Sequence, residues 1–294
     1  MLIRKWEKLP ADMQTAQVRK YYEILRKKNV SLFFKRVFDV VVSAIMLVIL
    51  SPLFLILAIA IKIDSRGPVF YRQERVTQYG KRFRIFKFRS MVENADKGSQ
   101  VTVDHDLRIT RVGKLIRKCR LDEISQLIDV FRGTMTFVGT RPEVPKYVER
   151  YTPEMKATLL LPAGVTSLAS IYYKDEAELL DGAEDTDKVY VDKILPAKMY
   201  YNLKAIERFG FWRDIKTMFM TVFAVLGKEY KGDYVPPEET AEGVISAPTE
   251  SDRTTEPPSA ESPESAQNAD TVTENRAAEE SPDFVANHQE NDPE

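Results

Sequence analysis

The stretch VFDVVVSAIMLVILSPLFLILAIAI, from Val37 to Ile61, is the clearest candidate for a membrane segment in this chain. Its 25 residues are interrupted only by Asp39, Ser43, Ser51 and Pro52. A straight helix of this length would exceed the roughly 30 Å hydrocarbon core of a bilayer, so a transmembrane span is the first interpretation.

Two features argue against an ordinary span. Pro52 removes a helix hydrogen bond, which predicts a bend, and Ser51 can satisfy the freed carbonyl. The bend would leave arms of 15 and 9 residues, Val37 to Ser51 and Leu53 to Ile61, each shorter than the ~20 residues of a span. Ten Lys or Arg precede the stretch and nine follow it before residue 92, so the positive-inside rule keeps both ends in the cytoplasm. We therefore predict a re-entrant hairpin, with a plain span as the alternative.

Charge is distributed unevenly along the 294 residues, whose formal net charge is −1. Residues 235–294 carry 16 Asp or Glu and two Arg, a net charge of −14, which leaves +13 on the rest. A basic body beside a membrane segment favours anionic lipid and phosphate-bearing ligands over nucleic acid as partners. One cysteine excludes an internal disulfide, and two histidines leave little material for a histidine metal site or a Ser-His-Asp triad.

Composition divides the chain into four predicted parts. These are a basic N-terminal arm (1–36), the re-entrant hairpin (37–61), a cytoplasmic domain (62–234) and an acidic tail (235–294). The tail is rich in Pro, Glu, Ser, Thr and Ala and cannot bury enough surface to fold, so we predict disorder there.

A surface helix is predicted near Thr15 to Lys28, because Val18, Tyr21, Tyr22 and Leu25 follow helical spacing. Two interpretations stay open for this basic segment. It lies against the bilayer, or it is an arm exposed to solvent.

A strand is predicted at Arg82 to Arg89, where basic and apolar residues nearly alternate. One slip in the alternation, at Ile85-Phe86, suggests a bulge, and the basic residues would form a cationic row on one face. That row would either bind phosphate or headgroups, or be a solvated strand face.

A helix broken near Leu121 is predicted within Arg108 to Gly133. Asp122 is well placed as an N-cap for a helix from Glu123 to Phe131, which Gly133 would end. The neighbouring carboxylates also suit another chemistry, in which one attacks phosphorus and the other holds a divalent cation such as Mg²⁺.

The segment Gly133 to Pro145 is predicted to be a turn-rich loop. In it, Arg141 before Pro142 either presents a planar fork to phosphate or is an exposed loop arginine. Residues 190–227 resume an amphipathic helical pattern. Its apolar end, Ile215 to Leu226, is too short to span and should pack on the body or rest in the membrane interface.

Six ordered motifs resemble those of the bacterial sugar transferases, the monotopic polyprenyl-phosphate sugar-1-phosphate transferases. They are the hairpin with Ser51-Pro52, then GPVFYRQERV, KFRSM, DLRITRVGKLIRK, RLDEISQL and GTMTFVGTRPE, between about Lys35 and Leu226. The chain resembles the small, single-hairpin form of this family.

The resemblance implies transfer of a sugar-1-phosphate from a nucleotide sugar to a membrane polyprenyl phosphate, at the cytoplasmic face of the bacterial inner membrane. It also implies Mg²⁺ as cofactor and downstream glycosyltransferases as further partners. The implied fold class is mixed α/β and mostly helical: a monotopic membrane protein with one re-entrant helix-break-helix hairpin and a disordered C-terminal tail.

The family's motifs assign roles to individual residues. The nucleophile falls on Asp122 and the carboxylate that supports the metal on Glu123, so both belong to the implied metal site. The implied phosphate-binding residues are Lys87, Arg89, Arg117 and Arg141. The implied nucleotide loop comprises Thr140, Arg141 and Pro142.

Several positions depart from the usual family pattern. Thr77 and Ser125 replace a frequent Gly and Pro, Thr140 replaces a Pro before Arg141, and Ala163 replaces a Pro before Gly164. The reaction class survives these changes, but the sugar and the base preference do not follow from the sequence.

Two rival functions use the same features. A non-catalytic membrane scaffold would bind anionic lipid through the basic body and recruit partners through the acidic tail. A membrane-bound glycoside hydrolase is the weaker rival, because its paired carboxylates usually lie ~5 to 9.5 Å apart and come from different places in the chain.

Overall fold

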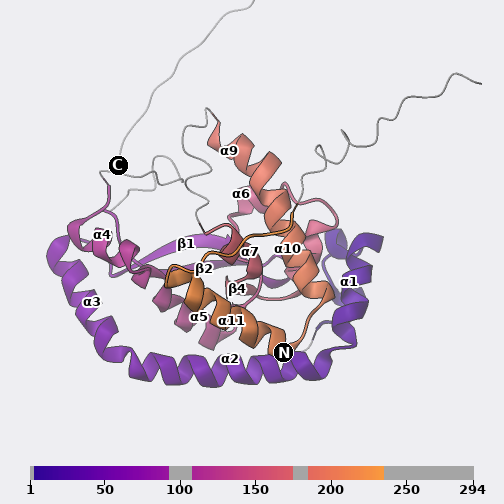
Figure 1. Cartoon of the computed structure of the whole chain (residues 1–294), viewed down its shortest axis with the longest axis horizontal. Coiled ribbons are helices and arrows are strands. Elements are labelled where there is room, and N and C mark those ends of the chain that lie inside the picture. The colour runs from indigo at the N-terminus through magenta and orange to yellow at the C-terminus, as the bar shows by residue number, and fades with distance from the viewer. Residues whose placement is uncertain (1–2, 93–107, 175–184, 235–294) are drawn as a thin grey trace, which may run out of the picture. The chain divides into compact units, whose positions relative to one another are not determined.

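The computed structural model describes residues 3–92, 108–174 and 185–234, so the predicted disorder of the tail lies outside the described residues. The α-helices are α1 Ala16–Arg26, α2 Asn29–Ile49, α3 Ser51–Asp64, α4 Arg111–Lys118, α5 Leu127–Arg132, α6 Pro145–Val148, α7 Leu168–Tyr172, α9 Thr186–Val189, α10 Leu195–Glu207 and α11 Phe211–Val225 (Figure 1). The strands are β1 Phe70–Val76, β2 Arg82–Phe88, β3 Met135–Val138 and β4 Ala163–Thr166. Short 3₁₀ helices occupy Trp6–Lys8, Ala11–Met13, Gln78–Gly80, Leu121–Gln126 and Met155–Leu160, and Tyr190–Ile194 is a π-helical turn. The predicted mixed and mostly helical class is confirmed.

The predicted bend is confirmed, and α2 and α3 meet at 61°. Pro52 has no N–H to offer the carbonyl of Val48, and the Ser51 hydroxyl donates to that oxygen at 2.8 Å instead. The break itself lies at Leu50, just before the predicted position, because a proline is well tolerated in the first turn of the following helix. The helices are also longer than the predicted arms, at 21 and 14 residues.

A membrane segment is supported here by length and composition alone. No single helix within residues 3–92, 108–174 and 185–234 is both long and apolar enough to cross a bilayer. The bent pair of α2 and α3 meets those requirements only when the two helices are taken together.

Polar side chains on one face of α2 attach it to the rest of the domain. Asp39 accepts from the Thr136 hydroxyl at 2.6 Å and from the Phe137 amide at 3.3 Å, and all three groups are buried. Lys35 forms an ion pair with Asp214 of α11 at 2.5 Å. Figure 1 shows α2 passing alongside α5 and α11, which agrees with these contacts. Asp39 therefore binds β3 inside the protein rather than interrupting an otherwise lipid-facing helix.

Arg36 also attaches α2 to the rest of the domain, through the C-terminal end of α5. Its guanidinium donates to the carbonyls of Val130 and Phe131 at 2.7 and 2.9 Å. Gly133 ends α5 as predicted, with φ of +87°, and a Cβ there would lie 2.9 Å from Nη2 of Arg36. Glycine therefore satisfies both the backbone conformation and the close approach of the arginine.

The predicted strand at Arg82 pairs with β1 in an antiparallel hairpin, but the expected bulge is wrong. The register runs without interruption from Phe70 opposite Phe88 to Val76 opposite Arg82. Both residues at the slip are covered: Ile85 is buried, and the Phe86 ring lies 3.5 Å from the Arg72 guanidinium. The strand has partners on both faces, so it accommodates the slip without an extra residue.

The basic residues of this strand do not form one cationic row. Successive strand residues point to opposite faces, so Arg84 and Lys87 lie on different sides. Arg84 is exposed, whereas Lys87 is partly buried and approaches the acidic pair.

A second, parallel sheet joins β3 and β4, with Thr136 opposite Gly164. The predicted turn-rich loop at Gly133 to Pro145 is therefore wrong where β3 lies, because a four-residue strand is too short to show a clear period. A Cβ on Gly164 would lie 2.2 Å from the Gly139 nitrogen, so the glycine permits the backbones to approach.

The predicted N-terminal helix is confirmed as α1, and Thr15 caps it by accepting from the Val18 amide at 3.3 Å. Its apolar residues are buried in one core with Leu160 and Met199, so its apolar face packs inside the protein and leaves only the polar face exposed.

Replacement of Asp39 tests the attachment of α2. Asp39→Ala should lower the free energy of unfolding by about 1–3 kcal/mol, because it leaves a buried hydroxyl and a buried amide without an acceptor. Asp39→Asn keeps one acceptor oxygen and should cost less. Thermal unfolding of the detergent-solubilised chain measures both. Equal midpoints for wild type and Asp39→Ala would show that the contact contributes no stability.

Candidate active site

The two neighbouring carboxylates lie in the 3₁₀ helix Leu121–Gln126, and the predicted N-cap role of Asp122 is wrong. The preceding residue, Arg120, begins the turn in the left-handed region with φ of +50°. The α-helix starts only at Leu127, and Asp122 accepts no capping hydrogen bond from it. A left-handed arginine is a strained conformation, of the kind that recurs at functional sites.

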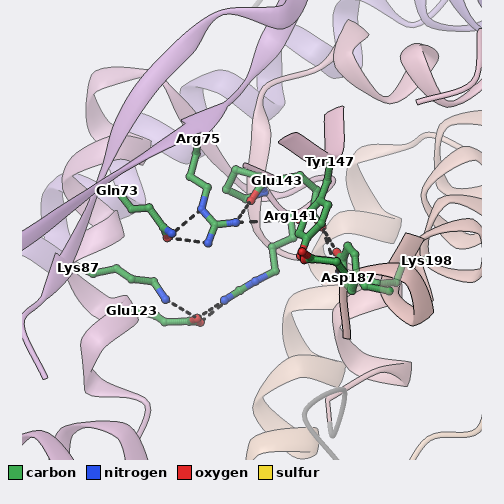
Figure 2. A network of polar contacts seen from close by, with 11 residues as sticks. Gln73, Arg75, Lys87, Glu123, Arg141, Glu143, Tyr147, Asp187 and Lys198 are labelled. Carbon is green, nitrogen blue, oxygen red and sulfur yellow. Dashed lines mark hydrogen bonds and ion pairs between the residues drawn. The ribbon is translucent and has the colours of Figure 1, made fainter. Parts of the chain in front are cut away.

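Two cations from separate elements face the acidic pair. Nζ of Lys87, on β2, lies 3.6 Å from Oδ2 of Asp122 and 3.8 Å from Oε1 of Glu123. Arg141, just after β3, forms a forked ion pair with Glu123. Figure 2 shows Lys87 and Arg141 converging on Glu123 from opposite sides. Because the side chain of Asp122 is 17% exposed, a ligand can reach it.

The two carboxylates differ in their ionisation. Burial would raise the pKa of Glu123, but the charges of Arg141 and Lys87 outweigh burial and lower it to about 2. Burial also raises the pKa of Asp122, and there Lys87 and Arg117 offset only part of the effect. Glu123 is therefore held as a paired anion, while Asp122 is the carboxylate with the higher pKa.

Arg117 and Arg89 have different positions relative to this pair. Arg117 Nε donates to the Ser90 hydroxyl at 3.0 Å, and its charge acts on Asp122. Arg89 is buried and donates to the carbonyls of Ser65 and Arg66 at 2.7 and 2.6 Å, just past the end of α3. The structure thus brings Arg117 to the site, whereas Arg89 binds the backbone that follows α3 and does not join the implied phosphate-binding group.

The implied nucleotide loop is held by its backbone. The carbonyl of Thr140 accepts from the Gly164 amide at 2.8 Å, and the carbonyl of Pro142 accepts from Arg75 at 3.0 Å. The loop therefore presents Arg141 from a position fixed by β4 on one side and β1 on the other.

Glu143, the next residue, is buried among cations. Oε1 accepts from the Tyr190 hydroxyl at 2.7 Å and from Nζ of Lys198 at 3.3 Å, and Arg75 lies 4.0 Å from the other oxygen. Burial opposes its ionisation, but Lys198 and Arg75 outweigh burial and lower the pKa of Glu143. The pairing with Lys198 ties the loop to α10.

Four further residues at the site, which were not predicted from the sequence, are Gln73, Arg75, Glu143 and Lys198. Gln73 accepts from Arg75 at 2.7 Å and holds its guanidinium beside the loop. Arg75 and Glu143 do occur within the quoted motifs GPVFYRQERV and GTMTFVGTRPE, which was a usable signal. Lys198 belongs to an amphipathic helix and gave none.

The donor groups at the site fit a Mg²⁺ ion shared with a substrate. Within the part of the chain that the structure describes, no three His, Cys, Asp or Glu side chains gather into a metal site. Magnesium commonly binds through one or two carboxylates plus substrate phosphates, and Asp122 and Glu123 offer that number. Within residues 3–92, 108–174 and 185–234, these two carboxylates are too few to hold the ion alone.

Loss of one partner in the Glu143 network should lower the stability of the fold. Glu143→Leu leaves Lys198 buried without its carboxylate and should destabilise the fold by about 3–5 kcal/mol. Adding Lys198→Met removes the unpaired cation and should recover most of the loss. Thermal unfolding of the single and double variants measures this coupling. A double variant as unstable as the single one would contradict it.

A family described as "Bacterial sugar transferase" matches residues 30–228. A UDP-glucose:undecaprenyl-phosphate glucose-1-phosphate transferase of Klebsiella pneumoniae is 36% identical over 201 residues, which cover 66% of this chain and 40% of that protein.

Two further relatives extend the comparison. A UDP-N-acetylgalactosamine-undecaprenyl-phosphate N-acetylgalactosaminephosphotransferase of Aeromonas hydrophila is 34% identical over 66% of this chain and 44% of its own length. A UDP-glucose:undecaprenyl-phosphate glucose-1-phosphate transferase of Caulobacter vibrioides is 33% identical over 65% of this chain and 69% of its own length. The chain thus spans less than half of the Klebsiella and Aeromonas proteins. The family match covers well over half of the chain and includes the acidic pair with its surrounding cations, so this protein belongs to the bacterial sugar transferase family.

Proposed function

We propose that this protein transfers a sugar-1-phosphate from a nucleotide sugar to a polyprenyl phosphate and so initiates assembly of a glycan or exopolysaccharide. The carrying observation is the partly exposed Asp122, beside a Glu123 that is already neutralised by two cations. The relatives' names favour a UDP-sugar as donor and undecaprenyl phosphate as acceptor.

The first step forms a phospho-aspartyl intermediate. A carboxylate oxygen of Asp122 attacks the phosphorus that carries the sugar, a new P–O bond forms, and the bond to the nucleoside monophosphate breaks. The leaving phosphate takes the electron pair. Lys87 and Arg141 lie where negative charge accumulates on the diphosphate, and their fixed position favours the transition state.

The second step releases the enzyme. A phosphate oxygen of the polyprenyl phosphate attacks the same phosphorus, the bond to Asp122 breaks, and the carboxylate is regenerated. The product is a polyprenyl diphosphate sugar. A bound Mg²⁺, held by Asp122 and Glu123 together with substrate phosphates, would neutralise the departing nucleotide phosphate.

The acceptor also requires a site beside the membrane. We place the protein on the cytoplasmic face of the bacterial inner membrane, with the α2–α3 hairpin entering and leaving by that face. The bend at Leu50 and the basic residues on both flanks support this topology.

Asp122→Asn tests the nucleophile directly. The variant should fold, since Asp122 caps no helix, and it should lose turnover and the covalent adduct completely. Intact-protein mass spectrometry after incubation with UDP-sugar and Mg²⁺ detects the adduct. Asp185→Asn is the matched control, because Asp185 caps α9 through the Lys188 amide at 3.0 Å and Asn caps as well as Asp.

Each outcome of this experiment decides between functions. Normal turnover by Asp122→Asn, after deamidation is excluded, would eliminate the proposed mechanism. An absence of adduct and turnover in wild type with every UDP-sugar offered would favour the non-catalytic scaffold.

The pH dependence gives an independent test. Asp122 acts as an anion, so adduct formation should fall as the pH drops through its raised pKa. Lys87 opposes that rise, so Lys87→Gln should move the acidic limb of the profile to higher pH, besides lowering the rate. Lys87→Arg keeps the charge and should keep the limb in place.

The limb is assignable because the pKa of Glu123 is about 2 and lies far below the measured range. Single-turnover rates of adduct formation across the pH range give the profile. An acidic limb that stays unchanged in Lys87→Gln would show that another group controls it.

A further inference from the structure

A hollow of about 800 Å³ opens where α10 ends and α11 begins, beside the start of α2. Its lining residues are Lys28, Ser31, Phe34, Glu207, Arg208, Phe209, Gly210, Phe211, Trp212 and Arg213. None of them belongs to the acidic pair or its surrounding cations. The hollow is therefore a separate feature that the proposed reaction does not use.

The charge of this hollow is positive. Lys28, Arg208 and Arg213 contribute three cations, and among the described residues no acidic side chain forms an ion pair with any of them. The hollow's one acidic residue, Glu207, is already paired with Lys20 at 2.7 Å. An anion that enters the hollow would therefore meet three cations, none of which is ion-paired with a described acidic side chain.

The walls of the hollow are held in place. The buried ion pair of Lys35 with Asp214 joins α2 to the first turn of α11. The rings of Phe38 and Phe211 also meet, with centroids 5.6 Å apart. Lys28 lies at the start of α2, Arg208 at the end of α10 and Arg213 in α11. The contacts between α2 and α11 fix the separation of Lys28 and Arg213, so binding requires little reorganisation of the backbone.

An exposed apolar stripe leads away from the hollow along α2. Its residues recur at helical spacing and end near the bend: Val30, Phe33, Phe34, Val37, Val41, Ile45 and Val48. At the mouth of the hollow, Trp212 is 79% exposed, and tryptophan favours the boundary between headgroups and acyl chains. A molecule with an anionic head and long apolar chains fits both parts at once.

We propose that this hollow binds the headgroup of an anionic phospholipid of the bilayer, with its acyl chains lying along the α2 stripe. The proposal rests on the membrane association proposed above and is independent of the transfer reaction. The site would fix the depth and rotation of the domain at the membrane surface.

The experiment uses Trp212 as a local reporter. The chain has two tryptophans, so the full-length Trp6→Phe protein retains Trp212 alone. It is placed in phosphatidylcholine nanodiscs that contain the same minor fraction of either bromo-phosphatidylglycerol or bromo-phosphatidylcholine. Quenching of Trp212 by each bromolipid is compared without any nucleotide sugar, so the result does not depend on catalysis.

We expect bromo-phosphatidylglycerol to quench several-fold more strongly, since each cation beside an anionic headgroup enriches it about fivefold. The triple variant Lys28→Gln, Arg208→Gln, Arg213→Gln should bring the ratio of the two signals close to one. A matched variant with the same charge change at the exposed Lys188, Lys193 and Lys231 should keep the wild-type ratio. Circular dichroism verifies that each variant is folded.

Three outcomes would overturn the proposal. Equal quenching by the two bromolipids in the parent protein would exclude headgroup selection. No quenching by either would show that Trp212 does not face the membrane. Loss of the excess on adding millimolar inorganic phosphate at constant ionic strength would assign the hollow to a soluble phosphate ligand.

Discussion

The fold depends on the polar face of α2, because this helix carries charged groups that only the rest of the domain can satisfy. Lys35, Arg36 and Asp39 reach α11, α5 and β3 respectively. Removing the partner of Lys35 or of Asp39 would leave a buried charge or a buried hydrogen-bonding group without compensation, which destabilises the fold by more than the contact itself stabilises it. The apolar stripe on the other side of α2 therefore faces outward and is exposed. One helix thus fixes both the attachment of the hairpin and the direction in which its apolar stripe is exposed.

The contacts that attach α2 also position the acidic pair and Arg141, through two separate elements. Asp39 holds Thr136 and Phe137 of β3, and the loop after that strand presents Arg141. Arg36 holds the end of α5, which continues directly from the 3₁₀ helix of Asp122 and Glu123. The ion pair between Arg141 and Glu123 connects these two attachments to each other. The acidic pair and Arg141 are therefore both held in position relative to the α2–α3 hairpin.

Features with a local cause could be predicted from the sequence, and features that depend on distant partners could not. The bend follows from Pro52 and the missing N–H, and the end of α5 follows from Gly133, so both were found. Asp122 is a residue type that often caps helices, but its segment packs against β2 and forms a 3₁₀ helix, in which its side chain caps nothing. Arg89 looked like its basic neighbours in the sequence, but its guanidinium donates hydrogen bonds to the carbonyls that follow α3. The helix at Val18 was found, but its environment depended on residues more than a hundred positions away.

The site itself shows how adjacent carboxylates can take different roles. In a 3₁₀ helix successive side chains point about a third of a turn apart, so Asp122 and Glu123 share Lys87 but only Glu123 also pairs with Arg141. Arg141 and Lys87 satisfy Glu123, whose pKa falls to about 2, whereas burial leaves the pKa of Asp122 raised. A higher pKa means a more basic and more nucleophilic oxygen, provided that it is ionised at the working pH. In the proposed reaction, the environment rather than the residue type therefore distinguishes Asp122, the attacking group, from Glu123, the paired anion.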